Sequence, residues 1–403
     1  MTRSRIVTRP FLLASGVLFA GSLAALAVLC IVQRIPMADT LVYRAEGAAV
    51  ANGTDLYGFT VTKWNLPATY PPFAAILFVP TTWLPVDALK IVFVAGNAAL
   101  LALLVHLSCR FARLPARPGM VLAATAFGLW LEPVFQTLLF GQINLALTCL
   151  VLWDLARPDG ALGKGFALGI AAGVKLTPAI FIVYLLLTGR VRAGLTALAS
   201  FTGTVLLGAL VLPGASVDFW TRRIFETDRV GKPWIVDNQS LQGLLSRVLH
   251  TPEPGLLWVA LAVATGVGGL WLARRVAVRD GRETWGVLIT ALTALLVSPI
   301  SWSHHWVWCV PLLAVLVAEG YVRTAAAVGA VFTARTLWLV PHQGDLDLQL
   351  PWWQQPLASP YPLLAAGLLL LAACAPAPAR PVPGQRGVRP QVPVRNEYAR
   401  RAK

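Results

Sequence analysis

A polar stretch that follows the first apolar segment carries the side chains best suited to chemistry. An apolar run covers residues 11–32, and residues 33–72 then hold several carboxylates spaced among Tyr and Trp side chains. Asp39 lies a few residues beyond the apolar run, where it is either a general base for a bound hydroxyl or a solvated loop carboxylate. A connector needs only a few residues, so the length and composition of this loop predict a functional role.

Three basic or imidazole side chains farther along the chain suit the binding of an anion. Lys175 is a lone lysine between two short apolar segments, a position typical of a phosphate contact or of a side chain that reaches the membrane interface. His304 and His305 stand between tryptophans in SPISWSHHWVW. They are candidate donors to a phosphate or a sugar hydroxyl, and the alternative is an aromatic turn at the membrane surface. Two adjacent histidines do not make a metal site, so no metal is expected.

Other aromatic and polar side chains are candidates for substrate contacts. The aromatic members of this set are Tyr43, Trp64 and Trp302, and the polar members are Asp55, Glu132, Gln142, Asn144, Asn238 and Gln239. Some have a structural alternative. Asp55 follows a turn signal, and Glu132, Gln142 and Asn144 suit hydrogen bonds between packed helices.

The elements that must hold these groups are apolar helices. Charged residues make up 13% of the chain and hydrophobic residues 57%, whereas soluble domains carry roughly 25% charged residues. Repeated continuous apolar runs therefore predict an all-α integral membrane protein. The 403 residues suffice for a polytopic bundle of about twelve transmembrane helices at ~20 residues each.

The charge distribution predicts the orientation of the bundle. The net charge is +15, and with an inner amino terminus most of the excess Arg and Lys falls on the inner loops and the carboxyl-terminal tail. This pattern puts a first outer loop (33–72) and a second outer loop (213–253) at the outer face of the plasma membrane. Residues 1–376 are predicted to form a single transmembrane domain. Residues 377–403 form a basic, Pro- and Arg-rich cytoplasmic tail that we expect to be disordered.

Several predicted segments are too short to cross a bilayer comfortably. Residues 71–84 are interrupted by prolines and predict a re-entrant or interfacial helix. Predicted spans over 118–131, 163–174 and 177–189 are short as well. Such helices are tolerated where protein or a water-filled cavity receives their polar ends. We therefore expect their outer turns to line a cavity beside the first outer loop.

The sequence disfavours a nucleotide or metal cofactor. It contains neither GxxxxGK[ST] nor GxGxxG after a strand, and Asp345-Leu346-Asp347 is its only DxD match. Five cysteines lie in or beside apolar runs without CxxC spacing, which suits small buried side chains. The basic tail suits anionic lipid better than nucleic acid. If the chain transfers a group, we expect a lipid-linked donor as co-substrate and no other cofactor.

Several sequence blocks, in one order, indicate a known family. They are DTLVYRAEGAAVANGTDLYG with ATYPPFAAILFVP, then FGQINLALTCLVLWDL, GVKLTPAIFIVYLLLTGR, DNQSLQGLLSR and LVSPISWSHHWVW. Over about residues 36–320 the chain resembles the actinobacterial polyprenyl-phosphate-mannose-dependent α-(1→2)-mannosyltransferases of glycosyltransferase family 87. Beyond residue 340 no specific resemblance is found.

The resemblance implies a fold, a reaction and a catalytic residue. The fold is of the GT-C type, a helical membrane bundle whose catalytic aspartate lies in the first outer loop, and by motif position this is Asp39. The implied reaction is inverting transfer of mannose from polyprenyl-phosphate mannose to a lipid-anchored glycan of the phosphatidylinositol mannoside or lipomannan type. An α-(1→2) linkage would form at the outer face of the membrane. The departing phosphate needs cationic donors, for which Lys175 with His304 or His305 are the candidates.

Three alternatives stay open. Related enzymes with arabinose donors share the architecture, so a polyprenyl-phosphate-arabinose-dependent arabinofuranosyltransferase is a rival of the same class. A non-enzymatic flippase for a polyprenyl-linked glycan is a rival of another class. Transporters commonly show paired halves with matching broken helices, whereas the short helices here cluster in one half. A membrane scaffold without catalytic activity is the third alternative.

Overall fold

The chain folds almost entirely into helices. A computed structural model describes residues 3–375. Within this range the only sheet is a hairpin of two short antiparallel strands, β1 (Thr60–Val61) and β2 (Leu66–Pro67). The predicted cytoplasmic tail, 377–403, lies outside the described residues. The expectation of an all-α membrane protein is confirmed by these helices and by their apolar composition.

Four helices are long and apolar enough to cross a membrane. They are α1 (Arg3–Val32), α4 (Val86–Phe111), α10 (Val191–Val211) and α13 (Gly255–Arg274), which a π-helical turn η5 (Arg275–Arg279) prolongs. Most of the side chains in their apolar windows are not buried against the protein. Their exposed faces therefore suit contact with lipid chains.

The remaining helices are shorter and fill the interior or the loops. Those of the bundle are α5 (Pro118–Gly128), α6 (Glu132–Phe140), α7 (Asn144–Leu155), α8 (Phe166–Val174), α9 (Ile180–Leu187), α14 (Glu283–Val297), α15 (Cys309–Ala318), α16 (Val322–Ala334) and α18 (Pro360–Cys374). Those of the loops are α2 (Ala38–Asn52), α3 (Pro72–Phe78), α11 (Pro213–Asp218), α12 (Leu241–Val248) and α17 (Gln355–Ala358). Single-turn 3₁₀ or π segments join them, namely η1 (Val79–Trp83), η2 (Thr177–Ala179), η3 (Phe219–Arg223), η4 (Thr227–Val230), η6 (Ser303–Trp308), η7 (Thr336–Trp338) and η8 (Leu346–Gln349).

The count of about twelve transmembrane helices is not confirmed. Each predicted span coincides with a helix, but apart from the four long helices these have 15 residues or fewer. At 1.5 Å per residue such a helix is shorter than the ~30 Å hydrocarbon layer. Helices α5 and α6 together could form a fifth span, but the chain bends by 77° between them. Proline and glycine at the helix ends, which hydropathy does not detect, shorten these segments.

Helices α8 and α9 form a hairpin with Lys175 at its tip. Gly165, Gly169 and Gly173 face α10 residues of increasing number, so α8 runs parallel to α10. Gly194, at the start of α10, faces Leu186 near the end of α9. Both open ends of the hairpin therefore meet the start of α10, and Lys175 lies at the far end, as expected for a re-entrant pair.

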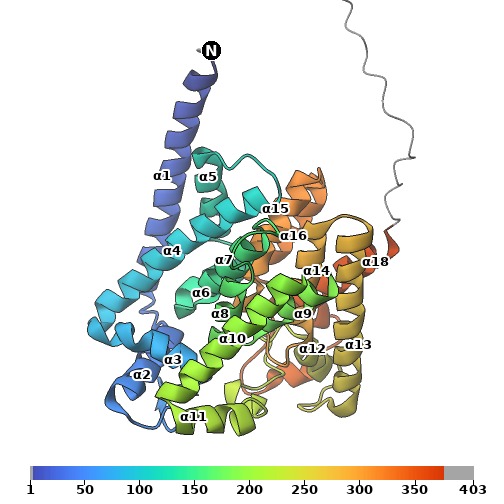
Figure 1. Ribbon diagram of the computed structural model, residues 1–403. Helices are drawn as coiled ribbons and strands as arrows, with labels where there is room; N and C mark the ends of the chain where they lie inside the picture. The colour runs from blue at the N-terminus through green and yellow to red at the C-terminus, as the bar shows by residue number, and fades with distance from the viewer. Residues whose placement is uncertain (1–2, 376–403) are drawn as a thin grey trace, which may run out of the picture.

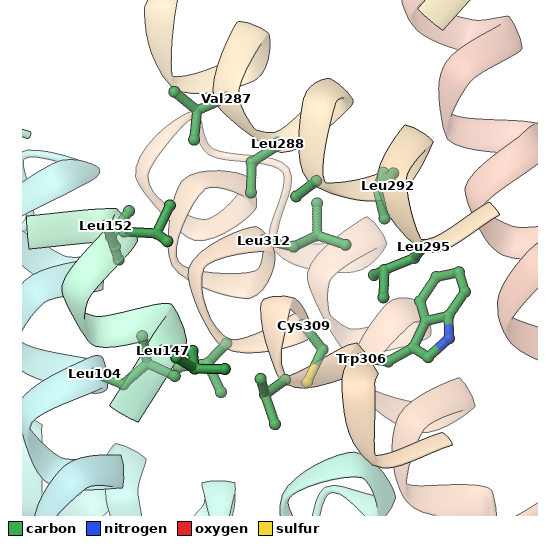
Figure 2. Close-up of a cluster of buried hydrophobic side chains, with 14 of the residues drawn as sticks. Leu104, Leu147, Leu152, Val287, Leu288, Leu292, Leu295, Trp306, Cys309 and Leu312 are labelled. Carbon is green, nitrogen blue, oxygen red and sulfur yellow. The ribbon is translucent and has the colours of Figure 1, made fainter. Parts of the chain in front are cut away.

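The hydrophobic core lies between the short helices. Helix α14 is buried at every position from Trp285 to Leu296. Figure 2 shows its leucines facing Leu147 and Leu152 of α7, Leu104 of α4 and Leu312 of α15. A helix that is apolar on all sides suits the centre of a bundle.

The two ends of the bundle differ in character. At one end, Arg190 bridges Asp159 (3.1 Å) and Glu283 (2.7 Å), and Arg282 pairs with Glu319 (2.7 Å). These ion pairs join four helix connections that the charge pattern predicts on the inner side. At the end away from the amino terminus, Figure 1 shows α2, α3 and α11 gathered together. These helices belong to the two predicted outer loops and to the segment 71–84, which is helical over α3 and η1.

Close packing of α8 on α10 is testable at Gly169. A methyl group there would overlap the Ala197 carbonyl oxygen and the Ser200 side chain. Since overpacking costs ~1–3 kcal/mol, we expect Gly169→Ala to lower the thermal unfolding temperature of the purified protein. Gly203→Ala on α10 is the control, because no atom lies within 4 Å of its added methyl group. Equal stability of the two variants would contradict the close approach of the helices.

Candidate active site

A cavity of about 860 Å³ lies between the loop helices and the short helices of the bundle. Its size is within the ~300–1,000 Å³ typical of small-molecule sites. The start of α2, the β1–β2 hairpin, the α6–α7 turn, the tip of the α8–α9 hairpin, the second outer loop and η6 all contribute to its wall. Its ionisable and imidazole residues are Asp39, Lys175, Arg223, Glu226, Arg229, Asp237, His304 and His305.

Asp39 lies in the first turn of α2 and faces the cavity. The turn is entered through Met37 in the left-handed region, φ 52°. A carboxylate at this place is favoured by the helix dipole. Burial nevertheless raises the pKa of Asp39 to about 6, while the Gln142 amide and the Lys175 ammonium act in the opposite direction. Asp39 forms no ion pair with Lys175 within 4.0 Å, so its oxygens remain available to a ligand.

A hydrogen-bond cluster fixes the neighbour of Asp39. The Oε1 atom of Gln142 accepts hydrogen bonds from Tyr43 Oη (2.9 Å) and Tyr70 Oη (3.2 Å). Because Oε1 is occupied by the two phenols, the amide nitrogen of Gln142 is the donor left for Asp39 or a substrate. Tyr43 itself is fully buried and does not line the cavity. Its structural role is to orient Gln142.

Lys175 is held by two partners on different helices. Its Nζ donates to Asn144 Oδ1 (3.1 Å) and to His305 Nε2 (2.9 Å). An ammonium group has three donors and no acceptor, so His305 Nε2 must accept, and one proton of Lys175 is left for the cavity. Asn144 and His305 therefore position the lysine.

The ring of His304, unlike that of its neighbour, makes no hydrogen bond among the described residues. Its Nε2 is buried and has no hydrogen-bond partner among the described residues. The ring packs edge-on against Phe140 and His305, with centroids 5.4 and 4.8 Å apart. The His304 carbonyl accepts from Thr137 (3.1 Å) and Asn144 (2.9 Å), which holds η6 against the α6–α7 turn. His304 lines the cavity, so its imidazole is a candidate contact for a ligand group.

Six of the predicted substrate contacts lie outside the cavity wall: Tyr43 and Asn144, described above, and four more. Asp55 is exposed and accepts the Tyr57 N–H (3.0 Å), as its turn signal indicates. Buried Glu132 accepts the Tyr361 hydroxyl (2.6 Å). Asn238 and Gln239 are buried, and their side chains bond backbone groups of neighbouring loops. We assign these four to packing.

The remaining predictions differ in outcome. Trp64 and Trp302 line the cavity and can face a sugar ring. The DxD pair braces the second outer loop, because Asp345 pairs with Lys232 (2.7 Å) and Asp347 accepts the Val236 N–H (2.8 Å). Within the range 3–375 no cluster of three or more His, Cys, Asp or Glu side chains suits a metal ion. The expectation of a metal-free site stays a prediction.

The second outer loop contributes charged groups that the sequence analysis did not select. Asp237 lines the cavity without a side-chain hydrogen bond in the described part of the chain, and burial raises its pKa. Buried Arg247 donates to the carbonyls of Ile235 (2.9 Å) and Asn238 (3.1 Å), which fixes the backbone on both sides of Asp237. Four acidic residues precede Asn238 in this loop, and no local pattern indicates which of them faces the cavity.

Helix α2 carries a second carboxyl group, that of Glu46, two turns after Asp39. Glu46, seven residues farther along, is only 1% exposed. Its Oε1 accepts the Thr69 N–H (3.2 Å), and Oε2 has no partner among the described residues. Burial, aided by the nearby Asp39 charge, raises the pKa of Glu46 to about 8. The group is therefore largely protonated at neutral pH.

Geometry and comparison together define the class of the protein. A helical bundle with apolar spans and a polar, substrate-sized cavity near one end is an integral membrane protein with a built ligand site. The sequence model of glycosyltransferase family 87 matches residues 68–299. The chain therefore belongs to glycosyltransferase family 87 and is a membrane glycosyltransferase. Lys175 and Asp237 lie within the matched segment, Asp39 precedes it, and the two histidines follow it.

Similar proteins come from mycobacteria. A polyprenol-phosphate-mannose-dependent α-(1-2)-phosphatidylinositol mannoside mannosyltransferase of Mycobacterium tuberculosis is 34% identical over 83% of this chain and 84% of its own length. The protein of the same name in Mycolicibacterium smegmatis is 32% identical over 79% of this chain and 79% of its own length. A polyprenol-phosphate-mannose-dependent α-(1-2)-phosphatidylinositol pentamannoside mannosyltransferase of M. tuberculosis is 36% identical over 68% of this chain and 65% of that protein. No solved structure matches the chain.

The raised pKa of Glu46 predicts a pH-dependent stability. The folded state keeps a proton on this carboxyl up to about pH 8, while an unfolded glutamate releases it near pH 4.3. Folding stability from this group is thus fully present below the unfolded pKa and is lost as the pH rises towards 8. Glu46→Gln removes this loss, so the variant should gain thermal stability over the unmodified protein at pH 8 and little at pH 5. A difference that does not grow with pH would contradict a buried, protonated Glu46.

Proposed function

We propose that the protein transfers mannose from polyprenyl-phosphate mannose to a phosphatidylinositol mannoside and forms an α-(1→2) linkage. One observation carries the proposal: Asp39, Lys175 and His304, far apart in the chain, line one cavity. A base and a phosphate-binding group are the two parts that this transfer needs. The names of the mycobacterial relatives support mannose as the sugar and a phosphatidylinositol mannoside as the acceptor.

The proposed reaction is a single in-line displacement. The acceptor hydroxyl gives its proton to Asp39 while its oxygen forms a bond to C1 of mannose. The bond between C1 and the phosphate oxygen breaks, and its electron pair stays on the departing polyprenyl phosphate. A β-linked donor then yields an α-mannoside through an oxocarbenium-like transition state. Phosphate is a good leaving group, so one carboxylate suffices and no general acid is needed.

The environment of Asp39 suits a base. A pKa of about 6 leaves the carboxylate mostly ionised at neutral pH and makes it a stronger proton acceptor than an ordinary aspartate. Catalysis by a general base is most efficient when its pKa lies near the working pH. The Gln142 amide, fixed by its two tyrosines, can hold the carboxylate or the incoming hydroxyl in place.

The phosphate-binding role is divided among three side chains. The free proton of Lys175 and the imidazole of His304 are proposed to contact the phosphate on which charge develops. His305 is a positioning residue in this scheme, because its Nε2 already accepts from Lys175. Lys175 is therefore the donor that the proposal depends on most.

We also propose that the cavity faces the outer side of the plasma membrane. The outer loops predicted from the charge pattern form most of its wall, including Asp39 and Arg229. The ion pairs around Arg190 involve loops predicted on the inner side. A lipid-linked donor and a glycolipid acceptor can both reach such a cavity from the outer leaflet.

Replacement of Asp39 tests the base. Asp39→Asn keeps the shape of the side chain but cannot take a proton, so we expect kcat to fall ~10²–10⁴-fold. The assay measures transfer of labelled mannose from polyprenyl-phosphate mannose to a phosphatidylinositol mannoside by the purified protein. Asp55→Asn, an exposed carboxylate of the same loop, should keep near-normal activity.

Three outcomes would overturn the assignment. Near-normal activity of Asp39→Asn would remove the proposed base. Loss of activity in Asp237→Asn with a normal Asp39→Asn would move the base to Asp237. Transfer of arabinose but not mannose by the unmodified protein would replace the proposed donor.

Replacement of Lys175 tests the phosphate contact. A charge-assisted hydrogen bond contributes ~1.5–3 kcal/mol, so Lys175→Ala should lower kcat/KM for the donor ~10–100-fold. The KM of the acceptor should stay unchanged. Lys90→Ala on α4, outside the cavity wall, is the matched control. Normal donor kinetics in Lys175→Ala would refute the role.

A further inference from the structure

Two arginines of the second outer loop line the cavity, and they differ in how their charge is balanced. Arg223 Nε donates to Asp218 (2.8 Å), and a further nitrogen lies 4.0 Å from Glu226. Arg222, on the exposed side, takes the other oxygen of Asp218 (2.7 Å). Two of the loop's acidic side chains are thus engaged by Arg222 and Arg223.

Arg229 has no such partner in the part of the chain that the structure describes. Its Nη1 donates to the Ala68 carbonyl and its Nε to the Arg223 carbonyl (2.6 and 3.1 Å). Carbonyl groups hold the guanidinium in place but do not neutralise it. Among residues 3–375, Arg229 forms no ion pair within 4.0 Å, and its Nη2 makes no hydrogen bond. Glu226 and Glu46 act on Arg229 only from beyond ion-pair distance.

The setting of Arg229 resembles a prepared anion site. The guanidinium stands over the rings of Tyr57 (5.9 Å) and Phe219 (6.0 Å), which support it from one side. The side chain is half-buried, and a partly desolvated cation without an ion-pair partner in contact is costly. The planar guanidinium fits two oxygens of a phosphate group. An anion that enters the cavity would therefore be stabilised at this position.

The phosphates of the two proposed substrates indicate which anion Arg229 would bind. The donor of the proposed reaction carries one phosphate, and Lys175 with His304 already serves it. The acceptor carries a second phosphate, the phosphodiester that joins its headgroup to diacylglycerol. This group stays at the membrane interface, and Arg229 belongs to a loop that follows the end of a membrane-length helix, α10.

We infer that Arg229 forms a second anion subsite, separate from Lys175, that binds the lipid phosphodiester of the glycolipid acceptor. The inference rests on the proposed function. It makes Arg229 a specificity residue: it selects an acceptor anchored through a phosphodiester over a neutral glycoside. Arg223 lies on the same wall and, paired with Asp218, helps to fix the loop.

A comparison of two acceptors tests the subsite. The unmodified protein and Arg229→Gln transfer mannose from the same donor either to a phosphatidylinositol mannoside or to neutral octyl α-mannoside. Glutamine can still donate to a carbonyl but carries no charge. We expect the KM of the anionic acceptor to rise ~10–100-fold in the variant, while the kinetics of the neutral acceptor and the KM of the donor stay unchanged. Arg229→Lys should recover part of the loss.

The controls separate this inference from the proposed function. Arg222→Ala, which removes an exposed arginine of the same loop, should leave both acceptors unaffected. In the unmodified protein, glycerophosphoinositol should compete with the anionic acceptor and not with the neutral one, which tests the subsite without any variant. Equal losses with both acceptors, a change confined to the donor KM, or no selective competition would overturn the subsite. Failure of the proposed function would instead appear as no mannose transfer to either acceptor by the unmodified protein.

Discussion

The cost of leaving polar groups unsatisfied inside an apolar bundle is the constraint on which this structure depends. Short helices end within the protein, and their polar ends need partners because lipid offers none. The tips of α6–α7 and α8–α9 meet η6 for this reason: Lys175 bonds Asn144 and His305 there, and Asn144 also bonds the His304 carbonyl. The same arrangement leaves Lys175 and His304 on the wall of a cavity. Stability of the bundle and preparation of the site thus have one physical origin.

The first outer loop supplies the acidic side of the cavity. Its helix α2 presents Asp39 at its start and Glu46 two turns later, so both carboxyl groups share a face. Burial raises the pKa of each, but to different extents, about 6 and about 8. The Gln142 amide and the Lys175 ammonium oppose the rise at Asp39, whereas the Asp39 charge adds to the rise at Glu46. One group is therefore suited to exchange a proton near neutral pH, and the other keeps its proton.

The second outer loop is fixed by interactions distant in sequence. Arg247 binds its backbone carbonyls, Asp347 accepts the Val236 N–H, and Asn238 bonds the segment before η6. These contacts hold Asp237 on the cavity wall, which Lys175 and Arg229 also line. The wall thus carries two cationic side chains from different parts of the chain. Such an arrangement suits two lipid substrates that each carry a phosphate.

Composition and local pattern determined that this chain is a helical membrane protein and where its apolar helices lie, and the family resemblance grouped Asp39, Lys175 and the two histidines. Those features follow from hydropathy, from rare charged residues beside apolar runs and from motif order, all of which are readable along one dimension. The tertiary structure decided that four helices among the described residues have membrane-spanning length, with α5 and α6 a bent fifth candidate. It also decided that Asn238, Gln239 and Glu132 serve packing, and that Asp237 and Arg229 line the cavity. Whether a polar side chain in a long loop turns inward or bonds a neighbouring loop depends on its partners. Some of these partners lie more than a hundred residues away in the chain. No local pattern encodes that choice, because the free energy that settles it comes from burial and hydrogen bonds formed only when the chain is folded.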